Sequence, residues 1–266
     1  MTILGSITNP DNDTLKYVRS LRDKKRARYQ EKRYVIEGLR LVAHALYRGY
    51  RPVFAFCTKE FATSPEGQTL LEQREAAETS VWLLSAALLA SISDTVSPQG
   101  IVAVLPMPDP DSDPVQGATL LLVLDRIGDP GNLGTMLRTA HAATFDAALL
   151  SVGCVDPYSP KVVRAGMGAH LDLPVWPSAP WPEIARLTRD TPQRVLADAG
   201  GERTIWEIDW SLPTALIIGS EAHGPGAEAQ ALATVRARLP MAEGAESLNA
   251  AIAMAVSAFE ALRQRQ

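Results

Sequence analysis

Asn132 and Arg138 are the polar side chains whose positions first indicate a ligand site. They follow residues 120–124, a short apolar run that predicts a strand buried on both faces and therefore parallel. Residues 126–134 hold three glycines and a proline, so their backbone can approach a ligand closely. A helix is expected over 135–143. Strand, glycine-rich turn and helix place ligands at the carboxyl end of a parallel sheet, although an ordinary turn with incidental glycines gives the same pattern.

Two common nucleotide-binding motifs are missing from this turn. A Walker A loop needs Gly-Lys followed by Ser or Thr, and the sequence has Gly134-Thr135-Met136 instead. A dinucleotide fingerprint needs the spacing G-x-G-x-x-G, whereas Gly128, Gly131 and Gly134 are three residues apart. A nicotinamide oxidoreductase, which would want that fingerprint, is therefore a weak alternative.

The composition of the 266 residues is that of a globular protein with one large or two ordinary domains. No apolar run approaches the roughly 20 residues of a membrane helix, and residues 1–10 lack an export signal, so a cytoplasmic protein is expected. Cys57 and Cys154 are far apart and predict neither a disulfide framework nor a metal site. The four histidines show no ligand spacing, so no metal is expected.

A basic segment lies near the N-terminus of a chain whose net charge is −4. It carries nine cationic side chains and two acidic ones, which leaves the remainder of the chain strongly acidic. The pattern favours contact with a nucleic-acid backbone, and the alternative is a solvated helix face. Tyr17, Tyr29 and Tyr34 interleave the segment and could stack on bases. The candidate RNA-binding residues are Lys16, Arg19, Arg22, Lys24, Lys25, Arg26, Arg28, Lys32 and Arg33.

The rest of the chain predicts two α/β domains joined by a linker. Residues 1–105 form the first, with strands expected at 35–36, 53–56, 81–84 and 100–105 and helices at 39–47, 65–77 and 86–91. Residues 106–117 alternate proline with aspartate and form the linker. Residues 118–266 form the second, with further strands at 147–152, 174–176, 194–197, 215–219 and 235–239 and helices at 160–168, 182–189 and 247–263.

Two of those later strands also run into glycine-containing polar loops. Residues 215–219 lead into 220–226, and residues 235–239 lead into the loop 240–246 before the alanine-rich last helix. Ser247 is expected to cap that helix, with Asn249 just inside it. Three strands therefore end in polar loops.

Three segments in this order resemble the motifs of the SPOUT superfamily, TrmH (SpoU) branch. They are DRIGDPGNLGTMLRTA at 125–140, IIGSEAHGP at 217–225 and LPMAEGAESLNAAIA at 239–253. Members are RNA ribose 2′-O-methyltransferases that use S-adenosyl-L-methionine. The N-terminal segment is similar to the substrate-binding domain of the family, which is L30e-like. Methyl transfer to RNA is what the resemblance implies.

The resemblance also implies a fold and a cofactor site. The C-terminal parallel-sheet α/β domain would contain a deep trefoil knot, which is rare among proteins, and would form a homodimer through its last helix. The positions implied to hold the cofactor are Leu196, Gly219, Leu239, Met241 and Leu248.

The same resemblance implies the catalytic set Arg138, Asn132, Glu221, Ser247 and Asn249. Arg138 is proposed in the family to remove the ribose proton, yet a guanidinium, with a pKa above about 12, is a poor base. It could instead clamp an adjacent RNA phosphate in a bidentate contact. Glu221 could orient Arg138.

The identity of the RNA is not readable from these residues. We expect 23S ribosomal RNA, favoured by the basic N-terminal segment, with transfer RNA as the alternative. A non-catalytic RNA-binding protein of ribosome assembly on the same fold is a further alternative, although it would not need the five catalytic positions.

Overall fold

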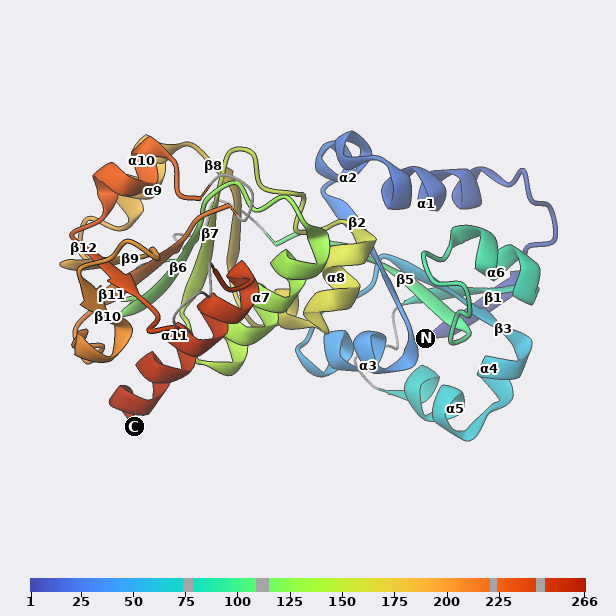
Figure 1. Ribbon diagram of the computed structural model, residues 1–266. Coiled ribbons are helices and arrows are strands. Elements are labelled where there is room, and N and C mark those ends of the chain that lie inside the picture. Colours follow the sequence, from blue (N-terminus) through green and yellow to red (C-terminus); the bar gives the residue numbers. More distant parts are fainter. Residues whose placement is uncertain (74–78, 109–114, 221–223, 243–246) are drawn as a thin grey trace. The chain divides into compact units, whose positions relative to one another are not determined.

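The structure is a computed structural model that describes residues 1–73, 79–108, 115–220, 224–242 and 247–266 (Figure 1). It contains two compact units. Met1–Asp109 and Tyr158–Leu171 form the first, and Pro110–Pro157 and Asp172–Gln266 form the second. None of the described helices is both long and apolar enough to span a membrane.

The first unit is built on a five-stranded sheet in the order β1-β4-β3-β5-β2. Its strands are β1 (Thr2–Ser6), β2 (Arg33–Glu37), β3 (Phe54–Thr58), β4 (Ser80–Leu84) and β5 (Ile101–Pro106). β1, β4 and β3 run parallel, whereas β5 is antiparallel to both of its neighbours. The predicted α/β character is confirmed, and β1 is an additional strand that the sequence pattern did not indicate.

Helices lie on both faces of this sheet (Figure 1). The helices of the N-terminal segment are α1 (Asp13–Asp23), α2 (Lys25–Glu31), α3 (Leu39–Tyr47), α4 (Lys59–Thr63), α5 (Pro65–Glu72) and α6 (Ala86–Ile92). Leu15, Val18 and Leu21 recur along one face of α1 and pack with Phe56 and Val104 in one core cluster. The apolar face of α3 joins a second cluster on the other side.

The segment Tyr158–Leu171 also belongs to the first unit, although the sequence pattern assigned it to the second domain. It contains α8 (Pro160–Gly166) and the short turn η2 (Ala169–Leu171). Tyr158, Val163 and Leu171 are buried in the same cluster as Ile36 and Val42. Burial of these apolar side chains stabilises the placement, which local sequence cannot reveal.

The second unit holds a seven-stranded parallel sheet in the order β10-β12-β9-β11-β6-β7-β8. Its strands are β6 (Leu120–Leu124), β7 (Ala147–Ser151), β8 (Val175–Ala179), β9 (Gln193–Ala197), β10 (Arg203–Thr204), β11 (Thr214–Ile218) and β12 (Val235–Arg238). Every residue of β6, β7 and β11 is buried, as expected for parallel strands covered on both faces.

Among the helices of the second unit, the one at Ala227–Leu232 was not predicted, and two others begin several residues away from their predicted starts. The helices are α7 (Pro130–Ala142), α9 (Trp181–Leu187), α10 (Ala227–Leu232) and α11 (Ala250–Arg265), with the short turn η3 (Ile205–Glu207). α7 begins before the predicted start at Thr135, because Asp129 accepts a hydrogen bond from the Asn132 amide and Pro130 fits the first helical turn. The cap of α11 is Asn249 and not the predicted Ser247.

Candidate functional site

A cavity of about 680 Å³ lies in the second unit, where the loops after β6, β9, β11 and β12 meet the start of α11. The loops after β6, β11 and β12 carry the three predicted motifs. The cavity wall combines apolar side chains with backbone and polar groups. The lining residues are Asp129, Asn132, Ala197, Asp198, Ala199, Ile205, Ile218, Gly219, Ser220, Gly224, Pro225, Ala237, Leu239, Met241, Ser247, Leu248, Asn249, Ala250 and Ala253. The carboxyl ends of parallel strands therefore form a pocket of the size that small ligands occupy.

Asn132 and Asn249 bring two of the predicted motifs together at this cavity. Asn249 Nδ2 donates a hydrogen bond to Asn132 Oδ1 at 3.3 Å. Asn249 Oδ1 accepts from the amides of Ala251 and Ile252, at 2.9 and 3.2 Å, and so caps α11. One side chain thus fixes the start of the last helix and holds the first turn of α7 beside it.

Four of the five predicted cofactor positions line the cavity, namely Gly219, Leu239, Met241 and Leu248. Leu196 does not, because its side chain is fully buried in the core cluster with Leu121 and Val123. The three residues that follow it in the chain line the cavity instead.

Asp198 is a cavity-lining acid that the sequence interpretation missed, although its place directly after a strand was a usable signal. Burial alone would raise the pKa of this carboxyl, but hydrogen bonds from Arg236 and from the Gly200 amide lower the pKa overall. The Arg236 Nε donates to Asp198 Oδ2 at 2.8 Å. The cavity therefore carries a carboxylate held ionised at neutral pH.

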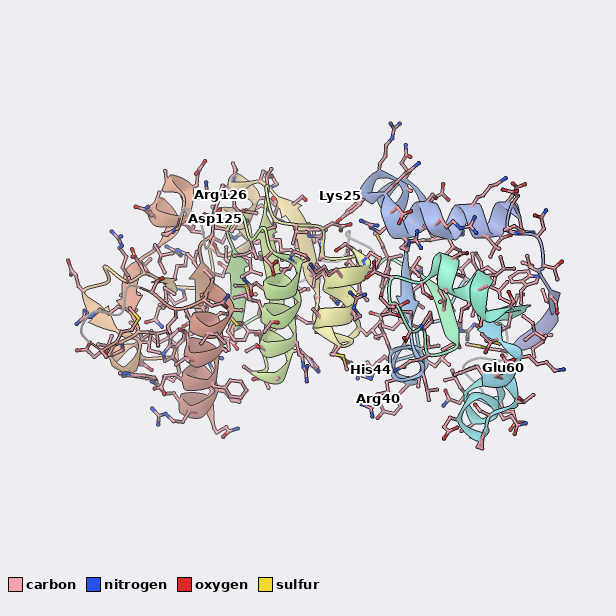
Figure 2. The ribbon with its side chains drawn as sticks, turned by 45° about the vertical axis from the view of Figure 1, so that its right-hand side comes forward. Lys25, Arg40, His44, Glu60, Asp125 and Arg126 are labelled. Atoms are coloured by element: carbon pink, nitrogen blue, oxygen red, sulfur yellow. The ribbon has the colours of Figure 1, made fainter. Side chains whose placement is uncertain are left out.

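Asp125, the residue after β6, fixes the loop that follows β11. Its carboxylate is completely buried and accepts a hydrogen bond from the Gly226 amide at 2.7 Å. It also accepts from Ser151 Oγ at 3.2 Å and from the Arg126 guanidinium, whose Nε lies at 3.2 Å (Figure 2). Gly224 and Pro225, immediately before Gly226, line the cavity. The buried carboxylate therefore ties one wall of the cavity to the central strand.

The same loop approaches its own strand at Gly219. A Cβ added there would lie 2.5 Å from the Pro225 nitrogen. Only glycine permits this close approach, so Gly219 is required by the packing of the two backbone segments.

Of the five predicted catalytic residues, Arg138 and Glu221 are not among the described residues that line the cavity. Arg138 is exposed on α7, does not line the cavity, and makes no hydrogen bond or ion pair with any described residue. It stands six residues after Asn132, which places it about 9 Å farther along the helix. Glu221 lies outside the residues that the structure describes.

The predicted RNA-binding residues divide into two groups. Lys16, Lys24, Lys25, Arg26 and Lys32 are exposed on or beside α1 and α2 (Lys25 in Figure 2). The guanidiniums of the other four are engaged within the protein.

Arg28 is almost fully buried and donates to the Leu21 and Arg22 carbonyls at 2.6 and 2.8 Å. Arg22 donates to the Ser91 and Ser93 carbonyls. Arg19 and Arg33 donate to Ser91 Oγ and to the Tyr17 hydroxyl, respectively. The position of Tyr34 excludes stacking on bases, because it is 1% exposed.

One face of α11 exposes a row of apolar side chains. Ile252 and Phe259 are each 51% exposed, and Leu248 lies just before the helix with 45%. Trp206, on η3, is half exposed, and it lines a shallow hollow together with Phe259. Contiguous exposed apolar side chains of this kind are typical of protein interaction surfaces.

Comparison with known proteins gives a consistent picture for both units. Residues 119–259 match the SpoU rRNA Methylase family, and residues 12–103 match the MRM3-like substrate binding domain. A relative from Synechocystis sp., named uncharacterized tRNA/rRNA methyltransferase slr1673, is 36% identical over 98% of this chain and 95% of its own length.

Two further relatives name a reaction or a cofactor. The 23S rRNA (guanosine(2553)-2′-O)-methyltransferase RlmP of Bacillus subtilis is 30% identical over 96% of this chain and 98% of its own. The crystal structure of AdoMet-bound rRNA methyltransferase from Sinorhizobium meliloti superposes with a TM-score of 0.85, at 31% identity over 98% of each chain. The fold, the three loops at the cavity and these matches agree: the chain belongs to the SpoU rRNA Methylase family.

Proposed function

We propose that this protein transfers a methyl group from S-adenosylmethionine to a ribose 2′-hydroxyl of ribosomal RNA, most simply 23S rRNA. The cavity carries this proposal, because three loops distant in sequence converge there in a chain of the SpoU family. The activity named for the Bacillus subtilis relative supports the ribose hydroxyl as acceptor. The likeness to a bacterial rRNA methyltransferase supports a cytoplasmic protein.

The described residues fit the cofactor. The cavity volume lies within the roughly 300–1,000 Å³ typical of small-molecule sites. A Cβ added at Gly224 would meet no atom within 4 Å, so this wall leaves open space. Leu239, Met241 and Leu248 offer apolar surface and backbone groups for the adenine and methionine parts. When bound, S-adenosylmethionine supplies an electrophilic methyl group.

The protein has two tasks in such a transfer, to position the ribose oxygen and to let its proton leave. Asn132 and Asn249, joined by a hydrogen bond at the cavity wall, would position the ribose, with Ser247 beside them. Arg138 would act on the RNA from outside the cavity. Its exposed guanidinium, unpaired among the described residues, supports a bidentate clamp on an adjacent phosphate. Glu221 would orient Arg138.

Substitution at Arg138 separates a clamp from a base. Lysine keeps the charge but lacks the planar fork, and its ordinary pKa of about 10.4 makes it the better base. If Arg138 clamps an RNA phosphate, the Arg138→Lys variant should be nearly inactive at every pH. Arg138→Ala should also be inactive, with normal cofactor binding. Activity of the lysine variant that rises at alkaline pH would instead identify Arg138 as the base.

The knot and the homodimer belong to the same proposal. In the sheet, β11 lies between β9 and β6, two strands that precede it in the chain, which is compatible with a threaded chain. The exposed apolar row at Leu248, Ile252 and Phe259 supports a dimer through α11. Ile252→Asp should then convert the protein to a monomer in sedimentation analysis. An unchanged dimer would remove α11 from the interface.

A further inference from the structure

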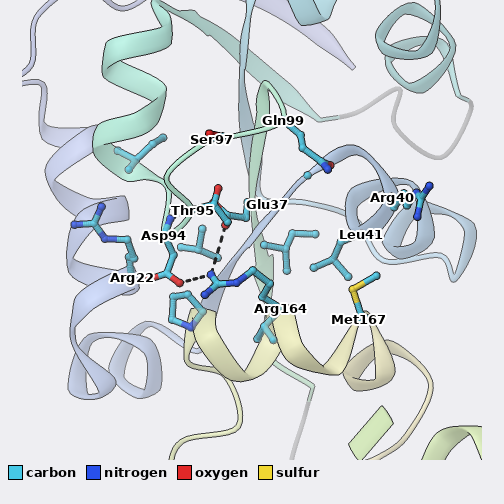
Figure 3. A pocket seen from close by; sticks show the side chains of 16 residues that line it. Arg22, Glu37, Arg40, Leu41, Asp94, Thr95, Ser97, Gln99, Arg164 and Met167 are labelled. Atoms are coloured by element: carbon cyan, nitrogen blue, oxygen red, sulfur yellow. Dashed lines mark hydrogen bonds and ion pairs between the residues drawn. The ribbon is translucent and has the colours of Figure 1, made fainter. Parts of the chain in front are cut away.

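A second cavity, of about 460 Å³, is lined by residues of the first unit, whereas the residues assigned to methyl transfer belong to the second. It opens at the end of β2, where the chain turns through Gly38 into α3. Gly38 has a φ of 92°, a left-handed conformation that favours glycine. The loop before β5 and the side chains of α8 form the remaining wall (Figure 3).

The floor of this cavity contains a carboxylate oxygen with unused hydrogen-bonding capacity. Glu37 Oε2 accepts from the Asp94 amide at 3.1 Å. Glu37 Oε1 is buried and makes no hydrogen bond with any described residue. A buried acceptor without a donor is costly, so this oxygen is suited to receive an N–H from a ligand.

A donor stands beside that acceptor. The Arg164 Nη1 forms an ion pair with Glu37 Oε1, at 3.8 Å, and a closer one with Asp94 (Figure 3). The hydrogen bond to Asp94 uses one of the five N–H groups of the guanidinium. The remaining N–H groups can meet an acceptor of a ligand. The floor therefore presents an acceptor next to a donor.

The walls suit a flat ring. Leu41 and Met167 lie together on one side of the Arg164 guanidinium (Figure 3), and Val163 of α8 also lines the cavity. Arg40, also in the lining, is exposed and makes no hydrogen bond or ion pair with any described residue (Figure 2). A cation at the mouth and an apolar wall with polar edges are the features that bind one unstacked nucleotide.

We propose that this cavity binds one unpaired guanine nucleotide of the RNA substrate, which rests on the proposed function. The guanine N1–H and N2–H groups donate to Glu37 Oε1, the adjacent O6 accepts from Arg164, and Arg40 contacts the phosphate. Guanine fits best because its edge places two donors beside one acceptor, whereas uracil offers one donor. The match of residues 12–103 to a substrate binding domain is consistent with this site.

Base preference of the full-length protein tests the proposal. The probes are short, labelled single-stranded oligouridylates that carry one central guanosine, adenosine or cytidine, with the plain oligouridylate as reference. Fluorescence anisotropy without cofactor should show roughly tenfold tighter binding of the guanosine probe. Glu37→Gln should abolish this preference, because its amide can turn a donor toward the guanine donors. Glu60→Gln, an exposed substitution on α4 of the same unit, is the matched control.

Glu37→Asp guards against a folding defect in the glutamine variant. It keeps the charge near Arg164 but withdraws the oxygen by one methylene, so the guanine preference should again be lost. Arg40→Ala should weaken all four probes equally.

Equal binding of all probes by the wild type, or a guanine preference that survives both Glu37 variants, overturns the guanine site alone. The proposed function is tested separately by calorimetric titration with S-adenosylmethionine. If the wild type binds neither cofactor nor any RNA, the proposed function fails and this inference fails with it.

Discussion

Asp125→Asn is the substitution that tests how the cofactor cavity is held together. The wild-type carboxylate accepts from the Gly226 amide, from Ser151 Oγ and from the Arg126 guanidinium, and it is fully buried. Asparagine keeps the shape but replaces one acceptor oxygen with an NH₂ donor. Either the Gly226 amide or the Ser151 hydroxyl then faces an N–H donor in place of an acceptor oxygen. The charge that pairs with Arg126 is lost as well.

The expected cost follows from burial. Leaving one buried donor without an acceptor costs about 1–3 kcal/mol, and this should appear as a lower free energy of unfolding. Because Gly226 directly follows the cavity-lining Gly224 and Pro225, part of the cost should appear in the cofactor site. A loss of about 1.4 kcal/mol there corresponds to roughly tenfold weaker binding of S-adenosylmethionine.

Denaturant unfolding and calorimetric titration measure the two effects on the same samples. Asp190→Asn is the control, because that side chain is exposed in the same unit, and it should change neither quantity. Unaltered stability and cofactor affinity in Asp125→Asn would refute the role of this carboxylate in holding the loop.

Three further predictions follow from the basic segment, the thiols and Asp198. Replacement of Lys24, Lys25 and Arg26 by alanine should reduce the slope of log affinity against log salt by up to about 2–3, because fewer counterions are released from the RNA; an unchanged slope would indicate a merely solvated face. Burial raises the pKa of the Cys57 thiol to about 11 and also raises the pKa of Cys154, so neither should react with iodoacetamide at neutral pH before unfolding. Rapid labelling of the folded protein would contradict that burial. Because the pKa of Asp198 is lowered in the folded state, its contribution to stability should be present above about pH 4 and lost as the pH falls through the lowered pKa. Asp198→Asn should remove this contribution from the acid unfolding curve. An identical curve would show that the ion pair with Arg236 does not contribute to stability.

Buried strands and motif residues were readable from the sequence because their signals are local. The apolar runs at β6 and β11 predicted strands covered on both faces, and both are fully buried. The three motifs predicted the loops that meet at the cavity, and seven of the ten catalytic and cofactor positions line it. The start of α7 was predicted too late, because Pro130 and the glycines after it were interpreted as a turn. Pro130 instead lies in the first helical turn, and Asp129 caps the helix.

Features that depend on packing between distant segments were not readable. The placement of α8 in the first unit depends on burial of Tyr158, Val163 and Leu171. Arg28 has the same side chain as its neighbour Arg26, yet only Arg28 is buried and bonded to carbonyls. Asp125 could be seen to end a strand, but its bond to Gly226, a hundred residues away, is a tertiary contact.

The most direct test of the central claim is the product formed on ribosomal RNA. Ribosomal RNA from a strain lacking the gene would be incubated with the protein and S-adenosylmethionine, digested to nucleosides and measured by mass spectrometry. The wild-type protein should produce a nucleoside methylated on its ribose, and Arg138→Ala should produce none. A nucleoside methylated on its base, or no methylation by the wild-type protein on this RNA, would contradict the proposed reaction.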